Sequence, residues 1–596
     1  MQKPTANILE RMGRNSAEHN DGVYTRLYRY LLREDIYYSA YQKLYANKGA
    51  ATKGIDQDTA DGFGKKYVDR LIADLSNGTY RPKPVRRVYI RKSNGKLRPL
   101  GIPSFRDKLL QEVIRRFLEA IYEPRFNDCS HGFRPNRSCH TALKRARCHF
   151  VGARWFIEGD IQGCFDNIDH KVLIGILERT IKDSRFINII RSFLEAGYME
   201  DWRYNQTQSG TPQGGIISPI LANIYLNELD KKVMEIKARF DRAPSKLVNT
   251  DYRRLKTRID RLEIKAKSAN GVEKDSLVAE IQKWKKQRLQ IPCHPQDDKN
   301  IAYIRYADDF ILAVKGSQED CTAIKTELAE FLQTGLKLTL SAEKTLITHS
   351  SERARFLGYD ISVRRNSQVK TDSAGRKMRT LNGTVELLVP LEKIERFMFD
   401  KGVITQSASK KFHPKHRKGW LFLPDYEILG RYNSEIRGIL NYYQLAVNYN
   451  RLNYFCYLME YSCLATLAGK YNSTVSKIHD KYACGKEWAI RYKTEKGTSR
   501  ERRIVKLADC KNSRVYEDII PVHAFVPSKT SDSIRARLLQ KRCELCGKEG
   551  EDFYEVHHVS SLKSLTGNHA WENLMRERRR KTLVVCEDCH VAINKE

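Results

Sequence analysis

The chain has 596 residues, and its 106 Lys and Arg residues outnumber its 72 Asp and Glu residues, giving a formal net charge of +34. Because an excess this large strains a compact fold unless a polyanion binds, we expect nucleic acid partners. No stretch reaches the ~18 apolar residues of a membrane span, and Met1 is followed by no apolar signal segment. We expect an intracellular protein of roughly three to five domains without membrane contact, whose 14 cysteines are thiols or metal ligands.

Residues 1–60 are basic and rich in aromatic side chains, as in the segment YTRLYRY at 24–30. Because arginines and tyrosines are interleaved there, a helix that faces RNA is favoured over one that is only solvated.

An apolar run then ends at Asp160, and the aromatic Phe165 follows five residues later. A carboxylate at a strand end is what polymerase chemistry needs to bridge two metal ions about 3.5–4 Å apart. Phe165 would pack against the sugar and exclude a 2′-hydroxyl, and a core aromatic is the alternative. Farther on, three glycines and two prolines at 209–219 predict a rigid loop whose backbone can approach a ligand closely.

Residues 230–292 predict a charged helical hairpin. Leu255, Ile259 and Leu262 repeat at helical spacing, as do Leu277, Ile281 and Trp284. Lys and Arg crowd the outer faces, so RNA binding and simple packing of the two helices on each other are equally open.

The tetrapeptide YADD at 306–309 predicts two strands joined by a tight turn, because apolar and β-branched residues flank it on both sides. Adjacent carboxylates repel each other, and a bound divalent cation removes that cost. Alone, such a pair indicates only a solvated turn. Asp160, Asp308 and Asp309 together would supply the carboxylates of a two-metal Mg²⁺ site.

Residues 366–480 are helical in pattern and rich in tyrosine, and we expect most aromatics at 441–443 and 452–461 in the core. The basic run 410–418 is the better candidate for contact with a nucleic acid backbone. Residues 481–540 lack strong periodicity and predict a loosely structured, cationic linker.

Two Cys-x-x-Cys pairs follow, Cys543 with Cys546 and Cys586 with Cys589. Four thiolates in two chelating pairs suit tetrahedral zinc. A module this small does not fold securely on its own core, so we expect the metal to hold it.

These segments, in this order, resemble the blocks of group II intron-encoded reverse transcriptases. The same family is indicated by NKGAATKGID at 47–56, KLRPLGIP at 96–103, SHGFRP at 130–135, GLKLTLSAEKT at 335–345 and FLGY at 356–359. The resemblance runs over nearly the whole chain. It implies a multidomain α+β protein, with a right-hand polymerase of fingers and palm, an α-helical thumb and a small zinc-bound ββα-metal (HNH) module.

Five regions are implied by the resemblance. They are an RNA-binding N-terminal extension (1–60), fingers and palm (61–365) with the helical insertion 230–292, a thumb or maturase domain (366–480), a DNA-binding segment (481–540) and an HNH endonuclease (541–596).

The resemblance also assigns roles in the polymerase. Asp160, Asp308 and Asp309 would be catalytic and would hold Mg²⁺, with Ile161 counted among the metal-binding positions. The residues expected to bind the incoming dNTP are Lys92, Arg98, Phe165, Gln213 and Lys344. For Lys92 and Arg98, which flank the turn at 93–95, a generic surface charge is the alternative.

Between and after the cysteine pairs, YEVHHV at 554–559 and HVAIN at 590–594 resemble an HNH nuclease, with adjacent histidines on a strand and ligands at i and i+4 of a helix. By this resemblance His558 is the general base that activates water, and His557, His590 and Asn594 hold one Mg²⁺. Related intron proteins usually carry His at the position of Asn594, although an amide oxygen also ligates a hard cation. Asn573 is the candidate orienting asparagine.

The implied function combines RNA-directed DNA polymerase, maturase that helps intron RNA splice, and site-specific DNA endonuclease. The expected partners are intron RNA, target DNA and dNTPs, in a bacterial cytoplasm and at the nucleoid during targeting. One alternative is a retron or diversity-generating reverse transcriptase, which would not be expected to carry the long thumb and HNH tail. The other is a splicing factor with a vestigial polymerase, against which the intact carboxylates and Gln213 argue. Whether a homodimer forms is left open.

Overall fold

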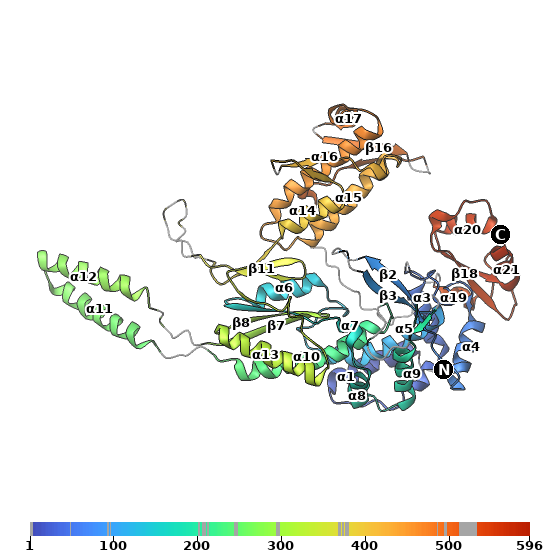
Figure 1. The fold of residues 1–596 in the computed structure, drawn as a ribbon, viewed down its shortest axis with the longest axis horizontal. Coiled ribbons are helices and arrows are strands. Elements are labelled where there is room, and N and C mark those ends of the chain that lie inside the picture. The colour runs from blue at the N-terminus through green and yellow to red at the C-terminus, as the bar shows by residue number, and fades with distance from the viewer. Residues whose placement is uncertain are drawn as a thin grey trace.

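The computed structural model describes residues 4–47, 49–91, 95, 97–200, 203–205, 210, 214–243, 248–291, 293, 298–366, 371, 373, 375, 381–409, 411–485, 487–493, 497–511 and 533–595. Two predicted nucleotide-binding residues, Lys92 and Gln213, lie outside this part of the chain, as does Lys410 of the basic run. Helices and strands mix in several regions, which makes a multidomain α/β protein (Figure 1). No described helix has the length and apolarity needed to cross a membrane.

A four-stranded antiparallel sheet, ordered β7-β8-β4-β9, lies at the centre. Its strands are Asn300–Tyr306 (β7), Asp309–Lys315 (β8), Trp155–Asp160 (β4) and Ile347–His349 (β9). Helix α6 (Cys139–His149) covers one face, and α10 (Ser218–Phe240) and α13 (Gln318–Gly335) cover the other (Figure 1). Because both faces are covered, successive apolar residues of β7 and β8 are buried, including Ile304, Phe310 and Ile311.

N-terminal helices pack against α5 (Phe105–Tyr122), which precedes the central sheet in the chain. Its N-cap Ser104 accepts a hydrogen bond from the Asp107 amide at 3.3 Å, and α1 and α3 pack against it. Other elements between the N-terminus and α10 are α1 (Thr5–Glu18), α2 (Tyr28–Leu31), α3 (Glu34–Leu44), β1 (Phe63–Gly64), α4 (Lys65–Ser76), α7 (Cys164–Asn167), α8 (His170–Thr180) and α9 (Ser184–Glu195). A second sheet, ordered β3-β2-β5-β6, contains β2 (Val85–Arg91), β3 (Leu97–Ile102), β5 (Tyr198–Glu200) and β6 (Arg203–Asn205).

The predicted helical hairpin is present as α11 (Thr250–Ser268) and α12 (Val272–Arg288), and it projects away from the rest of the molecule (Figure 1). Ile259 and Ile281 are its buried contacts between the two helices. The hairpin begins later than residue 230, because residues 230–240 continue α10, where Val233 and Ile236 are buried.

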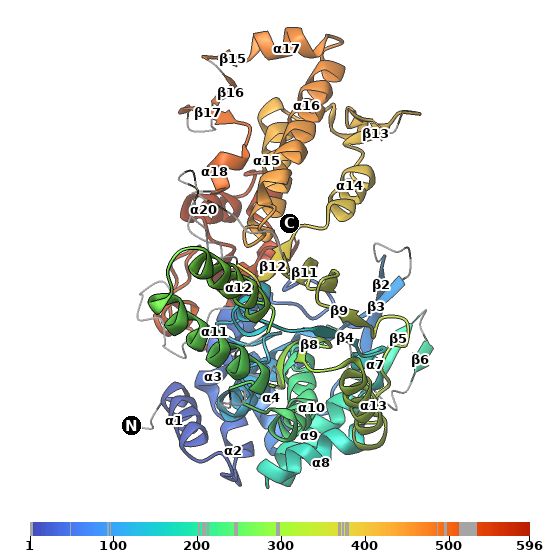
Figure 2. The same cartoon turned by 90° about the vertical axis from the view of Figure 1, so that its left-hand side faces the viewer.

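After the central sheet, a small sheet leads into two long helices, α15 (Asp425–Tyr442) and α16 (Leu452–Lys470), which lie side by side (Figure 2). Three tyrosines of α16 that were expected in the core are instead 52%, 48% and 40% exposed, namely Tyr454, Tyr457 and Tyr461. The other elements are β10 (Ala354–Phe356), β11 (Tyr359–Val363), β12 (Val385–Leu388), α14 (Leu391–Asp400), β13 (Ile404–Gln406), β14 (Phe412–Pro414) and α17 (Val475–Lys481).

The prediction of a loosely structured linker at 481–540 was wrong for its described residues. Strands β15 (Ala483–Cys484), β16 (Glu487–Lys493) and β17 (Ser499–Arg503) form a sheet, followed by α18 (Leu507–Lys511). Trp488 and Ile490 are buried, and β16 packs against α15. The alternation of apolar and charged residues in β16 was too short to stand out among the charges around it.

The C-terminal region packs against the N-terminal one. It contains α19 (Ile534–Leu539), β18 (Tyr554–His558), α20 (Ala570–Arg578), β19 (Thr582–Cys586) and α21 (Glu587–Lys595). Strand β1 pairs with β18, so residues far apart in sequence share one sheet, ordered β1-β18-β19. α19 contacts α3, and Phe63 and Val556 belong to one continuous apolar core (Figure 1).

Candidate functional site

Three carboxylates meet at one end of the central sheet. Asp160 ends β4 and lies directly opposite Asp309, which begins β8, while Asp308 occupies the turn before it. Burial and the neighbouring charges of Asp308 and Asp160 raise the pKa of Asp309 to about 7. Burial and Asp160 also raise the pKa of Asp308. A cation would remove this repulsion, so the three residues predicted to bind metal do lie together and have the chemistry for it.

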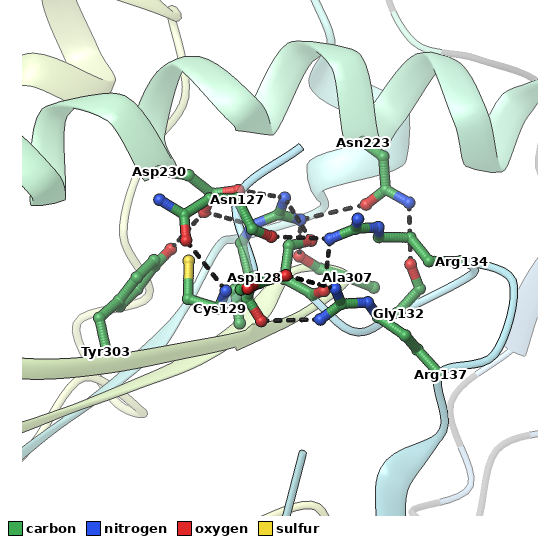
Figure 3. Close-up of polar contacts among 12 residues, drawn as sticks. Asn127, Asp128, Cys129, Gly132, Arg134, Arg137, Asn223, Asp230, Tyr303 and Ala307 are labelled. Carbon is green, nitrogen blue, oxygen red and sulfur yellow. Dashed lines mark hydrogen bonds and ion pairs between the residues drawn. The ribbon is translucent and has the colours of Figure 1, made fainter. Parts of the chain in front are cut away.

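A buried ion pair that sequence analysis missed supports the turn carrying these carboxylates. Arg305 is fully buried, and its guanidinium donates to Asp230 at 2.6 and 2.7 Å. The same guanidinium donates to the carbonyl of Ala307 at 2.9 Å, where the backbone adopts a left-handed φ of 56°. Tyr303 donates to Asp230 as well, and Figure 3 shows Asp230 projecting from its helix toward Tyr303. The sequence does contain a signal for this ion pair, since Arg305 is a charged residue inside an otherwise largely apolar strand.

The segment at 130–135 also contacts the turn that carries Asp308. Asn223 donates to the carbonyl of Gly132 at 2.8 Å, and both are drawn in Figure 3. A Cβ on Gly132 would lie 2.3 Å from the amide nitrogen of Ala307, so this close approach requires glycine. Sequence analysis recognised the segment but did not predict this contact.

Two predicted nucleotide-binding cations lie close to the carboxylates. Lys344 Nζ is 2.8 Å from Asp160 Oδ2. Arg98, exposed on β3, is near enough that its charge partly offsets the burial that raises the pKa of Asp308. The Ile161 side chain is buried, so only its backbone carbonyl is available to a metal.

Phe165 lies beside this site on α7 and is half-buried, with its ring edge-on to Phe133 at 6.2 Å. Phe133 is 45% exposed and has a φ of 57°, and sequence analysis gave it no role. Gly210 packs against this segment, since a Cβ on it would lie 2.7 Å from the Asp166 carbonyl. Residues 209 and 211–213 of the glycine-rich loop lie outside the described residues, and its approach to a ligand stays a prediction.

The four predicted zinc ligands converge. Their sulfur atoms, from Cys543, Cys546, Cys586 and Cys589, lie within 4.8 Å of one another. Although burial raises it, hydrogen bonds from backbone amides bring the pKa of Cys543 down to about 7. Burial and the neighbouring thiols raise the pKa of Cys586 and of Cys589. A cation would offset this crowding of thiolates, and four converging sulfur atoms can hold one.

The predicted nuclease residues lie beside this cluster. β18 ends in His557 and His558, and α21 carries His590 and Asn594, whose amide nitrogen is 3.4 Å from His590 Nε2. Burial lowers the pKa of His558, which favours the neutral imidazole that a general base requires. Asn573 is not brought to this group: it lies exposed on α20 and donates to the Gly567 carbonyl at 2.9 Å.

One further carboxylate enters the histidine cluster from the N-terminal region. Asp61 Oδ1 is 3.2 Å from His557 Nδ1, and Asp61 Oδ2 is 3.1 Å from His590 Nε2. Asp61 could not be predicted, because nothing in the sequence around it indicates a partner 497 residues away.

Comparison with known proteins identifies the family of the chain. Three family models match: "Reverse transcriptase (RNA-dependent DNA polymerase)" at 90–248 and 275–361, "Type II intron maturase" at 382–516, and "AI2M/AI1M-like, HNH endonuclease" at 543–590. The group II intron-encoded protein LtrA of Lactococcus lactis subsp. cremoris is 52% identical over 592 residues, covering 99% of this chain and 98% of that protein. The chain belongs to the group II intron-encoded proteins.

This group II intron-encoded protein combines reverse transcriptase, maturase and HNH endonuclease domains, as the sequence predicted. Family membership implies divalent metal use and binding of intron RNA and DNA. An uncharacterised 91 kDa protein in a cob intron of Schizosaccharomyces pombe is 35% identical, covering 99% of this chain and 72% of that protein. Protein YkfC of Escherichia coli is 35% identical, covering 57% of this chain and 84% of that protein. The full-length match to LtrA argues against the retron and diversity-generating alternatives.

Proposed function

We propose that Asp160, Asp308 and Asp309 hold two Mg²⁺ ions for DNA synthesis on an RNA template. The observation that carries this proposal is the pairing of Asp160 with Asp309 across adjacent strands, with Asp308 in the turn beside them. An all-oxygen donor set and a carboxyl pKa raised to about 7 fit a hard cation. When bound, the ions would activate the primer 3′-hydroxyl and neutralise the triphosphate.

The chain's own residues would position the nucleotide. Lys344, already 2.8 Å from Asp160, adds positive charge where the triphosphate would lie, and Arg98 suits bidentate phosphate contact. Phe165 would pack against the sugar. Lys92 and Gln213 are proposed for the same nucleotide site on the resemblance alone.

In this proposal the molecule is a right-hand polymerase. The central sheet is the palm, the β3-β2-β5-β6 sheet belongs to the fingers, and α14 to α17 form the thumb. The described residues of 481–511 would contact DNA. We place the protein in a bacterial cytoplasm, with intron RNA, target DNA and dNTPs as its partners; a homodimer is not part of the proposal.

Intron RNA would bind along several basic surfaces. One is a groove of about 990 Å³ between the N-terminal helices and α19, which Tyr30 and Tyr38 help to line. Its charged lining residues are the cations Arg11, Arg29, Arg33, Lys65, Arg535 and Lys541 and the acids Glu34, Asp35 and Asp552, so that positive charge is in excess. Cations beside aromatic rings suit single-stranded RNA, where phosphates are contacted and bases stack.

In the C-terminal module, zinc on the four cysteines would hold the fold. His558 would act as general base for cleavage of the second DNA strand, with His557, His590 and Asn594 around one Mg²⁺. The paired thiolates and the neutral His558 ring support these roles.

The polymerase assignment is tested with Asp160→Asn. We expect cDNA synthesis from an annealed primer to be lost while the variant still stimulates splicing of the intron RNA, because RNA contact comes from other surfaces. Asp260→Asn, an exposed substitution on the projecting hairpin, is the matched control. Near-normal primer extension by Asp160→Asn would remove that residue from the metal site.

A further inference from the structure

The position of Asp61 among the nuclease histidines is fixed by backbone pairing. The Gly62 amide donates to the Val556 carbonyl at 3.0 Å, and β1 then pairs with β18, with Phe63 opposite Val556. The amide of His558 donates to Asp61 Oδ1 at 2.7 Å. This pairing and this hydrogen bond place Asp61 beside the nuclease strand while the two regions are docked.

The donor atoms of Asp61, His557 and His590 lie close enough together to share one metal ion. His590 Nδ1 is 2.7 Å from Glu555 Oε2, which leaves Nε2 directed toward Asp61, as in a metal-binding histidine oriented by a carboxylate. The His557 ring is buried, and among the described residues neither of its nitrogens has a well-aligned hydrogen-bond partner, although Nδ1 is only 3.2 Å from Asp61. Proximity without alignment is expected of groups that converge on an ion. One donor atom from each of Asp61, His557 and His590 lies within 4.8 Å of the others.

The same docking covers the nuclease site. His557, His558 and His590 are 6%, 8% and 7% exposed. His558 Nε2 is 3.2 Å from the carbonyl oxygen of Tyr45, and the Tyr45 ring lies edge-on to the imidazole. A DNA phosphate, which needs both the base and the metal, has no access while the N-terminal region lies here.

We propose that Asp61 is a third protein ligand, supplied by the N-terminal region, of a divalent cation held by His557 and His590, and that this shared site keeps the nuclease closed to DNA. The inference rests on the proposed nuclease metal site and extends it to a second domain. In the open form, a phosphate oxygen would take the position that the Asp61 carboxylate occupies here. The polymerase would thus control its own nuclease through a metal bond between domains.

Metal affinity gives the first test, with readouts that do not depend on cleavage. The full-length, zinc-loaded protein is used with Asp160, Asp308 and Asp309 all changed to Asn, so that Mn²⁺ cannot bind there. Electron paramagnetic resonance then follows Mn²⁺ binding. We expect Asp61→Asn to weaken it at least tenfold, and Asp69→Asn, an exposed neighbour on α4, to leave it unchanged.

A further variant, His590→Ala, separates the inference from the proposed function. If His590→Ala abolishes Mn²⁺ binding but Asp61→Asn does not change it, the shared site is wrong and the proposed nuclease site stands. If the parent protein binds no Mn²⁺ that depends on His590, both are overturned, and Asp61 is only the ion-pair partner of a protonated imidazole.

The docking of the C-terminal region on the N-terminal region is measured by a zero-length carbodiimide cross-link. Lys66 Nζ and Glu587 Oε1 are 3.9 Å apart across the same interface, and both side chains are exposed. In the same Asn-substituted background, Mn²⁺ should raise the yield of this cross-link, and Asp61→Asn should remove that increase. On target DNA at saturating Mg²⁺, where a phosphate oxygen would replace the lost carboxylate as ligand, Asp61→Asn with an intact polymerase site should nick the second strand at least as fast as wild type. Loss of nicking would show that Asp61 is needed for cleavage and would overturn the closing role.

Discussion

The two proposed catalytic centres of this protein draw their residues from very different distances along the chain. The polymerase carboxylates come from adjacent strands of one sheet, where pairing of β4 with β8 brings Asp160 opposite Asp309. The nuclease group comes from a small module and from Asp61 in another region. The carboxylates of the first centre come together whenever its sheet folds, whereas the proposed shared metal site of the second exists only while two regions are docked. A site of the second kind can be controlled without changing its own residues.

The two centres also differ in the residues that hold them in place. The polymerase turn is supported by the buried pair of Arg305 and Asp230, which is part of the domain's core. The nuclease strand is supported by a cysteine cluster on one side and by β1 on the other. Removing a support should therefore affect one centre and leave the other.

The largest effect is expected from Asp308→Asn. Because phosphoryl transfer depends on metal placement, cDNA synthesis should fall by at least about 1,000-fold. Second-strand nicking on preformed target DNA should stay at the wild-type rate. Primer extension and strand-specific nicking, measured on one preparation, check both. A parallel fall in nicking would mean that the centres are coupled more closely than their geometry indicates.

Next comes Asp230→Asn, which leaves the Arg305 charge buried without its carboxylate. We expect a loss of about 3–5 kcal/mol in the free energy of unfolding, the usual cost of breaking a buried pair. Denaturant unfolding followed by tyrosine and tryptophan fluorescence measures it. Glu263→Gln, which breaks the exposed pair with Lys285 on the hairpin, is the control and should leave the free energy of unfolding close to the wild-type value.

A smaller and more local effect is expected from Cys586→Ser. Loss of one thiolate should release zinc and reduce nicking to below about one hundredth of the wild-type rate, because folding of so small a module depends on its metal. cDNA synthesis should change by less than about threefold, since the polymerase centre has its own support. Zinc content is measured by mass spectrometry, with the exposed Cys148→Ser as control. A nuclease that stays active without zinc would refute the structural role of the metal.

The smallest effect is expected from Arg98→Ala. Removing a phosphate contact should raise the KM for dNTPs about tenfold, corresponding to a charge-assisted hydrogen bond of about 1.5 kcal/mol. The affinity for intron RNA should be unchanged. Steady-state kinetics and filter binding separate the two, and an unaltered KM would remove Arg98 from the nucleotide site.

The sequence best predicted the features that depend on residues close together in the chain. Asp160 and the YADD turn stand out because a strand end and a tight turn are short-range patterns, and two Cys-x-x-Cys pairs imply convergence by their chemistry. Asp61 could not be found, because its role depends on the docking of two distant regions. The exposure of Tyr454, Tyr457 and Tyr461 was also hidden, since a helix rich in aromatics on several faces does not reveal which face is covered.

The shared sheet β1-β18-β19 constrains how this family can gain or lose its nuclease. Phe63 stacks on Tyr41 with ring centroids 3.9 Å apart and is completely buried, with Val556 as its strand partner. A shortened descendant without residues 533–596 would leave the open edge of β1 and apolar surface around Phe63 in contact with water, and such edges promote aggregation. Deletion of the nuclease would therefore be tolerated only after polar replacements had accumulated in the N-terminal region, so that the order of evolutionary steps is set by solubility.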